Sequence, residues 1–281
     1  MRVQEDNRQC VVFLCQEDKS FVGTGFLVVV PSKIQSEPSL LNPTKQIDGF
    51  LHIVTAKHVA QKIDGSPFFV RANNKKGSFE YLKSEDTKWY YHPTDNSTDV
   101  AVTPFWLSSD IDYKTIPINT FLTDEVLKEG KIGIGDEVYI VGLFAHVAGS
   151  KRNEPIVRIG NVAMIPNEPI QTKYGDIEAY LIEARSIGGI SGSPVFVRES
   201  FPRQGTHYLL GLMQAHWEIS SELKNDFKLN KEFNGQVNLG IAIVIPAKKI
   251  LEALNHPYLV DLRTKSETEK LKKSNQNQDI N

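Results

Sequence analysis

The sequence predicts an all-β protein, either a sandwich or a barrel. Short runs rich in β-branched and aromatic residues recur along the chain, and clusters of glycine, proline, asparagine and aspartate separate them, a spacing typical of strands joined by turns. Two polar segments, Val30–Phe50 and Ala72–Lys88, are expected to be long surface connections. In chain order, the expected strands cover residues 10–15, 23–30, 49–56, 66–72, 136–144, 156–165, 179–184, 193–198, 207–216 and 238–246.

The sequence after the last expected strand has a helical pattern. Pro246 suits the first turn of a helix, and Ile250 and Leu254 fall on one face at helical spacing. The expected closing helix covers about residues 246–256. The polar residues 263–281 offer almost nothing to bury, so we expect a disordered tail or a short exposed helix there.

Composition and charge indicate a globular protein with a sizeable core. The chain has 281 residues, of which 40% are hydrophobic, and a net charge of −2. The balanced charge offers no basic face for nucleic acid, and the apolar run at 11–14 is too short for a secretory signal or a membrane span. Cys10 and Cys15 lie an odd number of positions apart in one expected strand, on opposite faces, and we expect reduced thiols. These features predict a cytoplasmic protein that binds neither nucleic acid nor membrane.

The segment GGISGSPVF, Gly188–Phe196, places glycines on both sides of Ser191. Such a cluster forms a tight turn whose backbone amides need a partner, and a developing negative charge is one such partner. A serine hydroxyl becomes a good nucleophile when a base takes its proton and a third group orients that base. Taken alone, the segment fits an ordinary glycine turn between strands equally well.

His58 and Asp99 are the candidates for the base and the orienting acid. In FLHIVTAKHVA, His58 follows a buried-looking strand, where a side chain can be exposed at the end of a rigid support. Asp99 begins the apolar run DVAV, where burial beside an imidazole could keep the carboxylate ionised and orienting. Singly, each residue fits a structural role at the end of a strand. Together with Ser191 they favour nucleophilic catalysis.

Three motifs carry a family resemblance. VTAKHV, DVAV and GISGSP resemble the catalytic motifs of trypsin-like (chymotrypsin-fold) serine proteases, especially bacterial HtrA-like peptidases, while GTGFLV, GDEVYIVG and LGIAIVIPAKKIL resemble flanking strands and the closing helix. The match covers roughly residues 9–256, and three motifs in order are more specific than any one of them. The resemblance implies two six-stranded antiparallel β-barrels, at about 9–115 and 130–246, in a protease domain of residues 1–262 that ends in a C-terminal helix.

The resemblance also implies roles for individual residues. Ser191 would be the nucleophile, His58 the general base and then acid, and Asp99 the group that fixes the imidazole tautomer. The backbone amides of Gly189 and Ser191 would form the oxyanion hole. The implied activity is that of a serine endopeptidase that cleaves protein or peptide substrates through an acyl-enzyme, with neither a metal nor a cofactor.

Two residues bear on substrate preference. Arg185 lies six residues before the nucleophile, a position near the base of the family's pocket for the residue before the cleaved bond (P1). A buried guanidinium there would favour an acidic P1 side chain, and His216 would add a second donor. The alternative is that Arg185 points to solvent and that His216 simply faces the sheet.

The chain departs from the family in two places. Ile190 occupies the position where many secreted relatives carry an acid that pairs with a new N-terminus, so we do not expect activation by propeptide cleavage. HtrA proteases usually carry a peptide-binding PDZ domain, but the residues after Leu254 are too few for a domain. Regulation is therefore expected to come from the insertions, from a partner protein or from a homo-oligomer.

Two other functions remain open at this point. One is a protease-fold module that captures an extended peptide by strand addition and has little or no catalytic activity. Intact His58, Asp99 and Ser191 argue against it, because a pure binding module does not need them. The other is an esterase or a processing enzyme that acts on a single partner.

Overall fold

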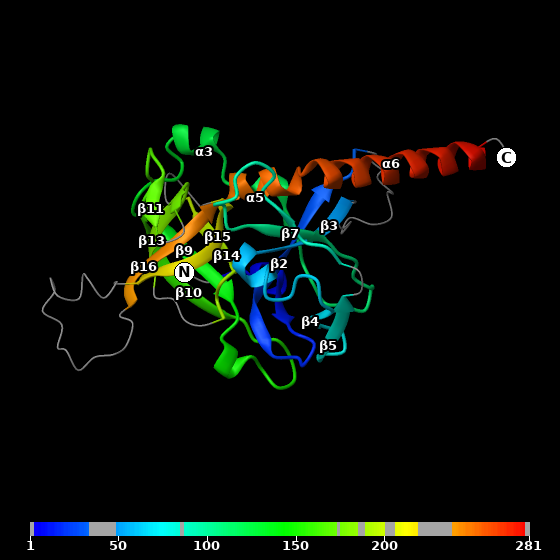
Figure 1. Cartoon of the computed structure of the whole chain (residues 1–281), viewed down its shortest axis with the longest axis horizontal. Helices are drawn as coiled ribbons and strands as arrows, with labels where there is room; N and C mark the ends of the chain where they lie inside the picture. Colours follow the sequence, from blue (N-terminus) through cyan, green and yellow to red (C-terminus); the bar gives the residue numbers. More distant parts are fainter. Residues whose placement is uncertain are drawn as a thin grey trace, which may run out of the picture.

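Two β lobes lie side by side, and the C-terminal helix α6 extends away from them (Figure 1). The computed structural model describes residues 3–33, 49–84, 87–172, 175–184, 189–199, 206–218 and 238–278, with the backbone alone for 215–218, 238, 239 and 273–278.

The N-terminal lobe is an eight-stranded sheet. Seven strands follow the hydrogen-bonded order β5-β4-β1-β2-β3-β7-β6 in antiparallel pairs, and β8 pairs with β2 in parallel. The strands are β1 Val11–Cys15, β2 Phe21–Pro31, β3 Gly49–Thr55, β4 Phe68–Asn73, β5 Phe79–Ser84, β6 Tyr90–Tyr91, β7 Ala101–Pro104 and β8 Ile116–Pro117.

The second lobe is a closed antiparallel barrel with the strand order β10-β13-β16-β15-β14-β9. Its strands are β9 Glu137–Gly142, β10 Ile156–Met164, β13 Tyr180–Glu183, β14 Pro194–Arg198, β15 His207–Glu218 and β16 Asn238–Pro246. The short strands β11 Ile170–Thr172 and β12 Gly175–Ile177 form a separate two-stranded sheet.

The short helices lie outside the strands. They are α1 Glu5–Gln9, α2 Lys57–Ala60, α3 Asp124–Lys128 and the 3-10 turns η1 Ile118–Thr120 and η2 Ala145–Val147. After β16 follow α5 Ala247–Leu254, within the range expected for the closing helix, and α6 Pro257–Gln278. Among the described helices, none combines the length and the apolar composition needed to cross a bilayer.

The predicted all-β class and the six-stranded barrel of the second lobe are confirmed, but the strand count of the first lobe is wrong. It has eight strands where six were expected, and its path of paired strands ends at β5 and β6 within the described residues. The strands β6 and β8 have two residues each, too few to show a repeating apolar pattern. The polar strand β5 falls in a segment expected to be a surface connection.

One apolar core continues from the first lobe to the outer face of the barrel. Side chains alternate along a strand, so the two faces of β9 pack into different clusters. Val138 and Ile140 pack among the other barrel strands, whereas Tyr139 and Val141 join the cluster that contains Phe13 of the first lobe. All four β9 side chains are fully buried, which explains why this strand is an unbroken apolar run in the sequence.

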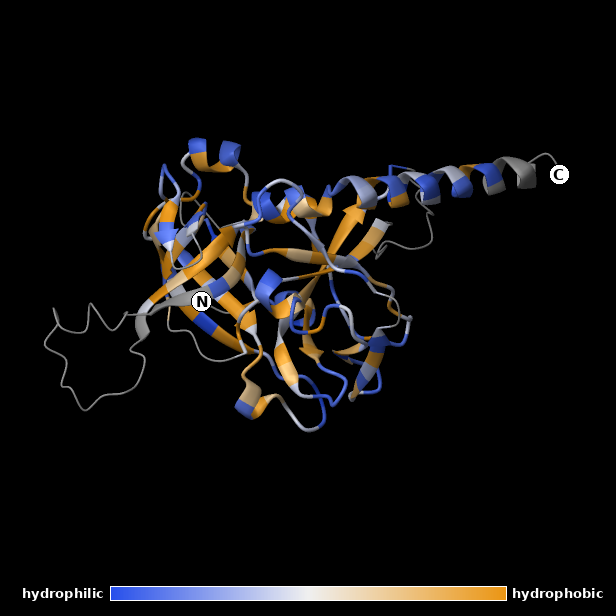
Figure 2. Cartoon of the chain, in the orientation of Figure 1, coloured by the Kyte–Doolittle hydropathy of each residue, from blue (hydrophilic) through white to orange (hydrophobic). Residues whose placement is uncertain are grey.

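The polar tail, for which disorder or a short exposed helix was expected, is helical as far as Gln278 in the 22-residue α6. Its side chains are mostly hydrophilic (Figure 2), and its order comes from contacts at its N-terminal half. Leu259 is fully buried. Arg263 Nη1 donates to the carbonyl oxygen of Leu254 at 2.8 Å, and Glu267 accepts from the backbone amide of Lys33 at 2.7 Å. These tertiary partners have no signature in the sequence of the tail itself.

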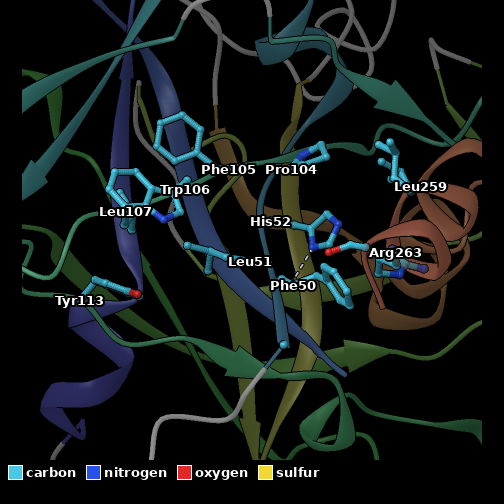
Figure 3. A pocket seen from close by; sticks show the side chains of 13 residues that line it. Phe50, Leu51, His52, Pro104, Phe105, Trp106, Leu107, Tyr113, Leu259 and Arg263 are labelled. Atoms are coloured by element: carbon cyan, nitrogen blue, oxygen red, sulfur yellow. Dashed lines mark hydrogen bonds between the residues drawn. The ribbon is translucent and has the colours of Figure 1, made fainter. Parts of the chain in front are cut away.

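A groove of about 400 Å³ lies between α6, the start of β3 and the segment after β7 (Figure 3). Its walls are mainly apolar, with Leu51 and Trp106 among the lining residues, and His52 and Arg263 are its basic members. His52 is 2% exposed, and its Nδ1 lies 2.9 Å from the carbonyl oxygen of Phe50, so Nδ1 carries the proton. Burial, together with the charge of Arg263, lowers the pKa of His52 to about 4.

Replacing His52 by glutamine should make the stability less sensitive to acid. An unfolded chain protonates its histidines near pH 6.5, whereas the pKa of folded His52 is about 4. The unfolded state therefore binds the proton more readily, and stability is lost as the pH falls from about 6.5 to 4. Between pH 7 and pH 5, the free energy of unfolding of the native chain should fall by about 2 kcal/mol more than that of His52→Gln, measured by urea denaturation. Equal losses in the two proteins would contradict this assignment.

Candidate active site

His58 and Asp99 form a close pair at the end of β3. The strand ends at Thr55, and α2 begins two residues later, so His58 projects from a rigid support. Its Nδ1 lies 2.7 Å from Asp99 Oδ2, and its backbone amide donates to Asp99 Oδ1 at 2.9 Å. The Asp99 side chain is 9% exposed and that of His58 38%. Because a carboxylate only accepts, Nδ1 carries the proton and Nε2 is left with a lone pair that can act as a base.

The turn that carries Ser191 depends on glycine at two positions. Gly189 and Gly192 have φ angles of +95° and +82°, which side chains of L-residues rarely adopt. A Cβ on Gly192 would also lie 2.2 Å from the carbonyl oxygen of Thr24 and 2.3 Å from Thr55 Oγ1. The glycines around Ser191 therefore allow the turn to pack directly on the first lobe.

Thr24, on β2, joins the Ser191 turn to the first lobe through its amide and its hydroxyl. Its amide donates to the carbonyl oxygen of Ser191 at 3.0 Å, and its hydroxyl donates to that of Gly189 at 2.9 Å. The same hydroxyl accepts from the amide of Leu143 at 2.9 Å, and the carbonyl oxygen of Thr24 accepts from Thr55 Oγ1 at 2.7 Å. Thr24 is fully buried, so these bonds have no competition from water.

The backbone amides of Gly189 and Ser191 make no hydrogen bond to the described residues. The carbonyl oxygen of Ile190 accepts from the amide of Ser193 at 3.1 Å. Since a trans peptide directs its N–H opposite to its C=O, the Ser191 amide points away from Ser193. The direction of the Gly189 amide is set by its peptide bond to Gly188, which lies outside the described residues.

The Ser191 turn lies against the residues that flank His58. A Cβ on Gly192 would lie 3.1 Å from the amide nitrogen of Ala56, two positions before His58. Within the described part of the chain, no hydrogen bond joins Ser191 Oγ to the imidazole. Such bonds are often long before a substrate binds. The fold thus pairs His58 with Asp99 and places the Ser191 turn beside the end of the strand that presents His58.

The structure describes less of the two residues predicted to set substrate specificity than of His58, Asp99 and Ser191. Arg185 lies outside the described residues. His216 belongs to β15, where its backbone pairs with Ala242 of β16, and its side chain is not described. A preference for an acidic P1 residue therefore stays a prediction.

Ile190 is 1% exposed and packs in the apolar cluster of the barrel. An isoleucine in this apolar cluster supplies no charge for a zymogen-type ion pair. Independence from propeptide cleavage remains a prediction.

Sequence reasoning missed Thr24 as a functional residue. Its only signal was the resemblance of GTGFLV to a strand of the family, and a threonine in a strand has no special pattern. Its partner Gly189 lies 165 positions away.

The groove beside His52 includes none of the candidate site residues, because it lies at the start of β3, whereas His58 follows the end of that strand. We therefore locate the site from hydrogen-bond geometry.

No family model and no curated protein matches the sequence, whereas solved structures do match the fold. The MamO protease domain from Magnetospirillum magneticum is 14% identical, with a TM-score of 0.54 over 89% of this chain and 97% of that one. The active form of the Rv3671c protease from M. tuberculosis is 15% identical over 89% of this chain and 81% of that one, with a TM-score of 0.49. The HtrA-type protease AlgW with a decapeptide is 17% identical over 92% and 66%, with a TM-score of 0.47.

At these identities a structural match shows the fold alone. We infer the fold from the match to MamO, because its TM-score is the one above 0.5 among these three. That match extends over both lobes and nearly the whole of the MamO domain. The chain therefore has the double-lobed fold of the MamO protease domain.

Proposed function

We propose that the protein is a serine endopeptidase that cleaves peptide bonds through an acyl-enzyme. The observation that carries this proposal is the His58–Asp99 pair, in which Nδ1 lies 2.7 Å from the carboxylate and Nε2 is left as the free base. The Ser191 turn packs on the residues that flank His58, and Ser191 is the proposed nucleophile.

The first half of the reaction forms the acyl-enzyme. As Ser191 Oγ attacks the substrate carbonyl carbon, His58 Nε2 takes the hydroxyl proton, and the carbonyl electrons move to the oxygen. Asp99 holds the imidazole in the required tautomer and stabilises the imidazolium. The tetrahedral intermediate then collapses, and the imidazolium gives its proton to the departing amine. In the second half, His58 Nε2 takes a proton from water as the water attacks the acyl carbon, the bond from that carbon to Ser191 Oγ breaks, and the imidazolium returns the proton to Oγ as the acid product leaves.

The proposed oxyanion hole consists of the amides of Gly189 and Ser191. Both lack a partner among the described residues, and an unpaired amide in a turn held rigidly by Thr24 is preorganised to bind a developing negative charge. Removal of one donor from such a site typically lowers the rate by about a hundredfold or more.

The second candidate function is a peptide-binding module with little or no catalytic activity. It is favoured by one observation, the missing hydrogen bond between Ser191 Oγ and His58 in the described part of the chain. The tests below separate the two functions.

A fluorophosphonate probe should modify the protein at a single residue, Ser191. The phosphorus reacts with a serine that a neighbouring base activates, so the adduct should disappear in Ser191→Ala and fall at least about a hundredfold in rate in His58→Ala. Intact mass measures the number of adducts, and peptide mapping locates the site.

Ser193→Ala is the matched control, because Ser193 lies in the same turn but is fully buried. This variant should keep the adduct. An adduct elsewhere, or none on the native chain with several probes and peptides, would contradict the proposed protease and support the binding module.

We further propose that the enzyme prefers an acidic P1 residue, with Arg185 as its counter-charge. This proposal rests on the sequence position of Arg185. Peptides that differ only at P1 should be cleaved at least about tenfold faster, in kcat/KM, with glutamate than with leucine. Arg185→Ala should remove the preference, and Arg185→Lys should keep part of it. The same order of substrates in the native enzyme and in Arg185→Ala would rule Arg185 out.

A further inference from the structure

We propose that Lys249 of α5 is a positioning residue for Asp99, an inference that rests on the proposed function. The Lys249 side chain is only 9% exposed. Three carboxylates surround its Nζ: Glu178 Oε1 at 3.4 Å, Glu252 Oε2 at 3.6 Å and Asp95 Oδ2 at 3.8 Å. An ammonium withdrawn from water is stable only where such charges compensate it, so the position of Lys249 is coupled to theirs.

Asp95 organises the turn that delivers Asp99. Its Oδ1 accepts from the amide of Ser97 at 2.9 Å and from the Ser97 hydroxyl at 2.6 Å, and its Oδ2 accepts from Thr98 Oγ1 at 2.6 Å. Burial raises the pKa of Asp95, but these hydrogen bonds and the charge of Lys249 outweigh it and lower the pKa to about 2. The ionised carboxylate therefore fixes the backbone directly before Asp99.

His92 ties the same turn to α5 a second time. Its Nδ1 accepts from the amides of Asp95 at 2.9 Å and Thr94 at 3.4 Å, so this nitrogen has a lone pair. The proton is then on Nε2, which donates to Glu252 Oε2. Glu252 thus accepts a hydrogen bond from His92 and pairs with Lys249. Helix α5 therefore holds the turn through two of its side chains, Glu252 and Lys249.

The opposite side of the turn is attached to the helix of His58. Lys57 Nζ donates to the backbone carbonyl oxygen of Asn96 at 2.9 Å and to its Oδ1 at 3.0 Å. The turn is therefore clamped between α2, which presents His58, and α5, which presents Lys249. A shift of the turn changes the geometry between Asp99 and the imidazole.

Loss of the Lys249 charge should loosen this clamp. Without the ammonium, the carboxylates of Asp95, Glu178 and Glu252 repel one another, and Asp95 is the one attached to the turn. A misplacement of about 1 Å near reacting groups can cost about a hundredfold in rate. We expect about a tenfold loss in the rate at which Ser191 is labelled, because Lys249 acts on the site through the turn that carries Asp99.

The experiment compares Lys249→Met, which keeps most of the length but not the charge, with Lys249→Arg, which keeps the charge. Lys248→Met is the matched control, because Lys248 is the next residue of α5 and pairs with Glu178 at 2.9 Å but not with Asp95. Two readouts are taken: the rate of fluorophosphonate labelling at Ser191, and the low-field proton resonance of His58 Nδ1–H, assigned by its loss in His58→Ala.

Lys249→Met should broaden or shift this resonance and slow labelling about tenfold, whereas Lys249→Arg and Lys248→Met should stay within about threefold of the native rate. If Lys249→Met does not fold, Asp95→Asn tests the same link and should give the same losses. An unchanged resonance in Lys249→Met, or equal losses in Lys248→Met, would overturn the proposal. Absence of labelling in the native protein would instead contradict the protease function, while the resonance would still test the role of Lys249.

Discussion

The hydrogen bonds of one buried residue, Thr24, hold the candidate site together. Its amide and hydroxyl bind the carbonyl oxygens of Ser191 and Gly189, and its own carbonyl accepts from Thr55 at the end of the strand that presents His58. Since buried polar groups need partners, any other placement of the Ser191 turn would leave these groups unpaired. The turn is thereby held in one position relative to β3.

The two lobes supply different parts of the site and depend on each other. The first lobe presents His58 and Asp99, the second presents Ser191, and a continuous apolar core lies between the lobes. Polar contacts then set the finer geometry, with Thr24 beside the Ser191 turn and the charged network of Lys249 beside the turn that carries Asp99. Apolar packing can bring two lobes together but does not orient polar groups, so these directional contacts carry the precision that the proposed chemistry needs.

Sequence and structure agree where local pattern decides the outcome. Strands β9 and β14 were predictable because strands buried on both faces are unbroken apolar runs, and His58, Asp99 and Ser191 were singled out through motifs. The short strands β6 and β8 were missed because two residues show no periodicity. The full length of helix α6 was not predicted because its anchors, such as the contact of Glu267 with Lys33, lie far away in the chain. Contacts between distant polar residues have no local signature.

The most direct test of this account compares Thr24→Val with Thr24→Ser. Valine has nearly the shape of threonine but leaves the Gly189 carbonyl and the Leu143 amide without their partner, at a cost of about 1–3 kcal/mol in stability, whereas serine keeps the hydroxyl. A peptide boronic acid mimics the tetrahedral intermediate. The affinity for it should fall at least about tenfold in Thr24→Val, whereas in Thr24→Ser it should stay within about threefold of the native affinity. The affinity for an uncleaved peptide should be unchanged in both variants. Native boronate affinity in Thr24→Val, or equal losses in both variants, would contradict the central role of the Thr24 hydroxyl.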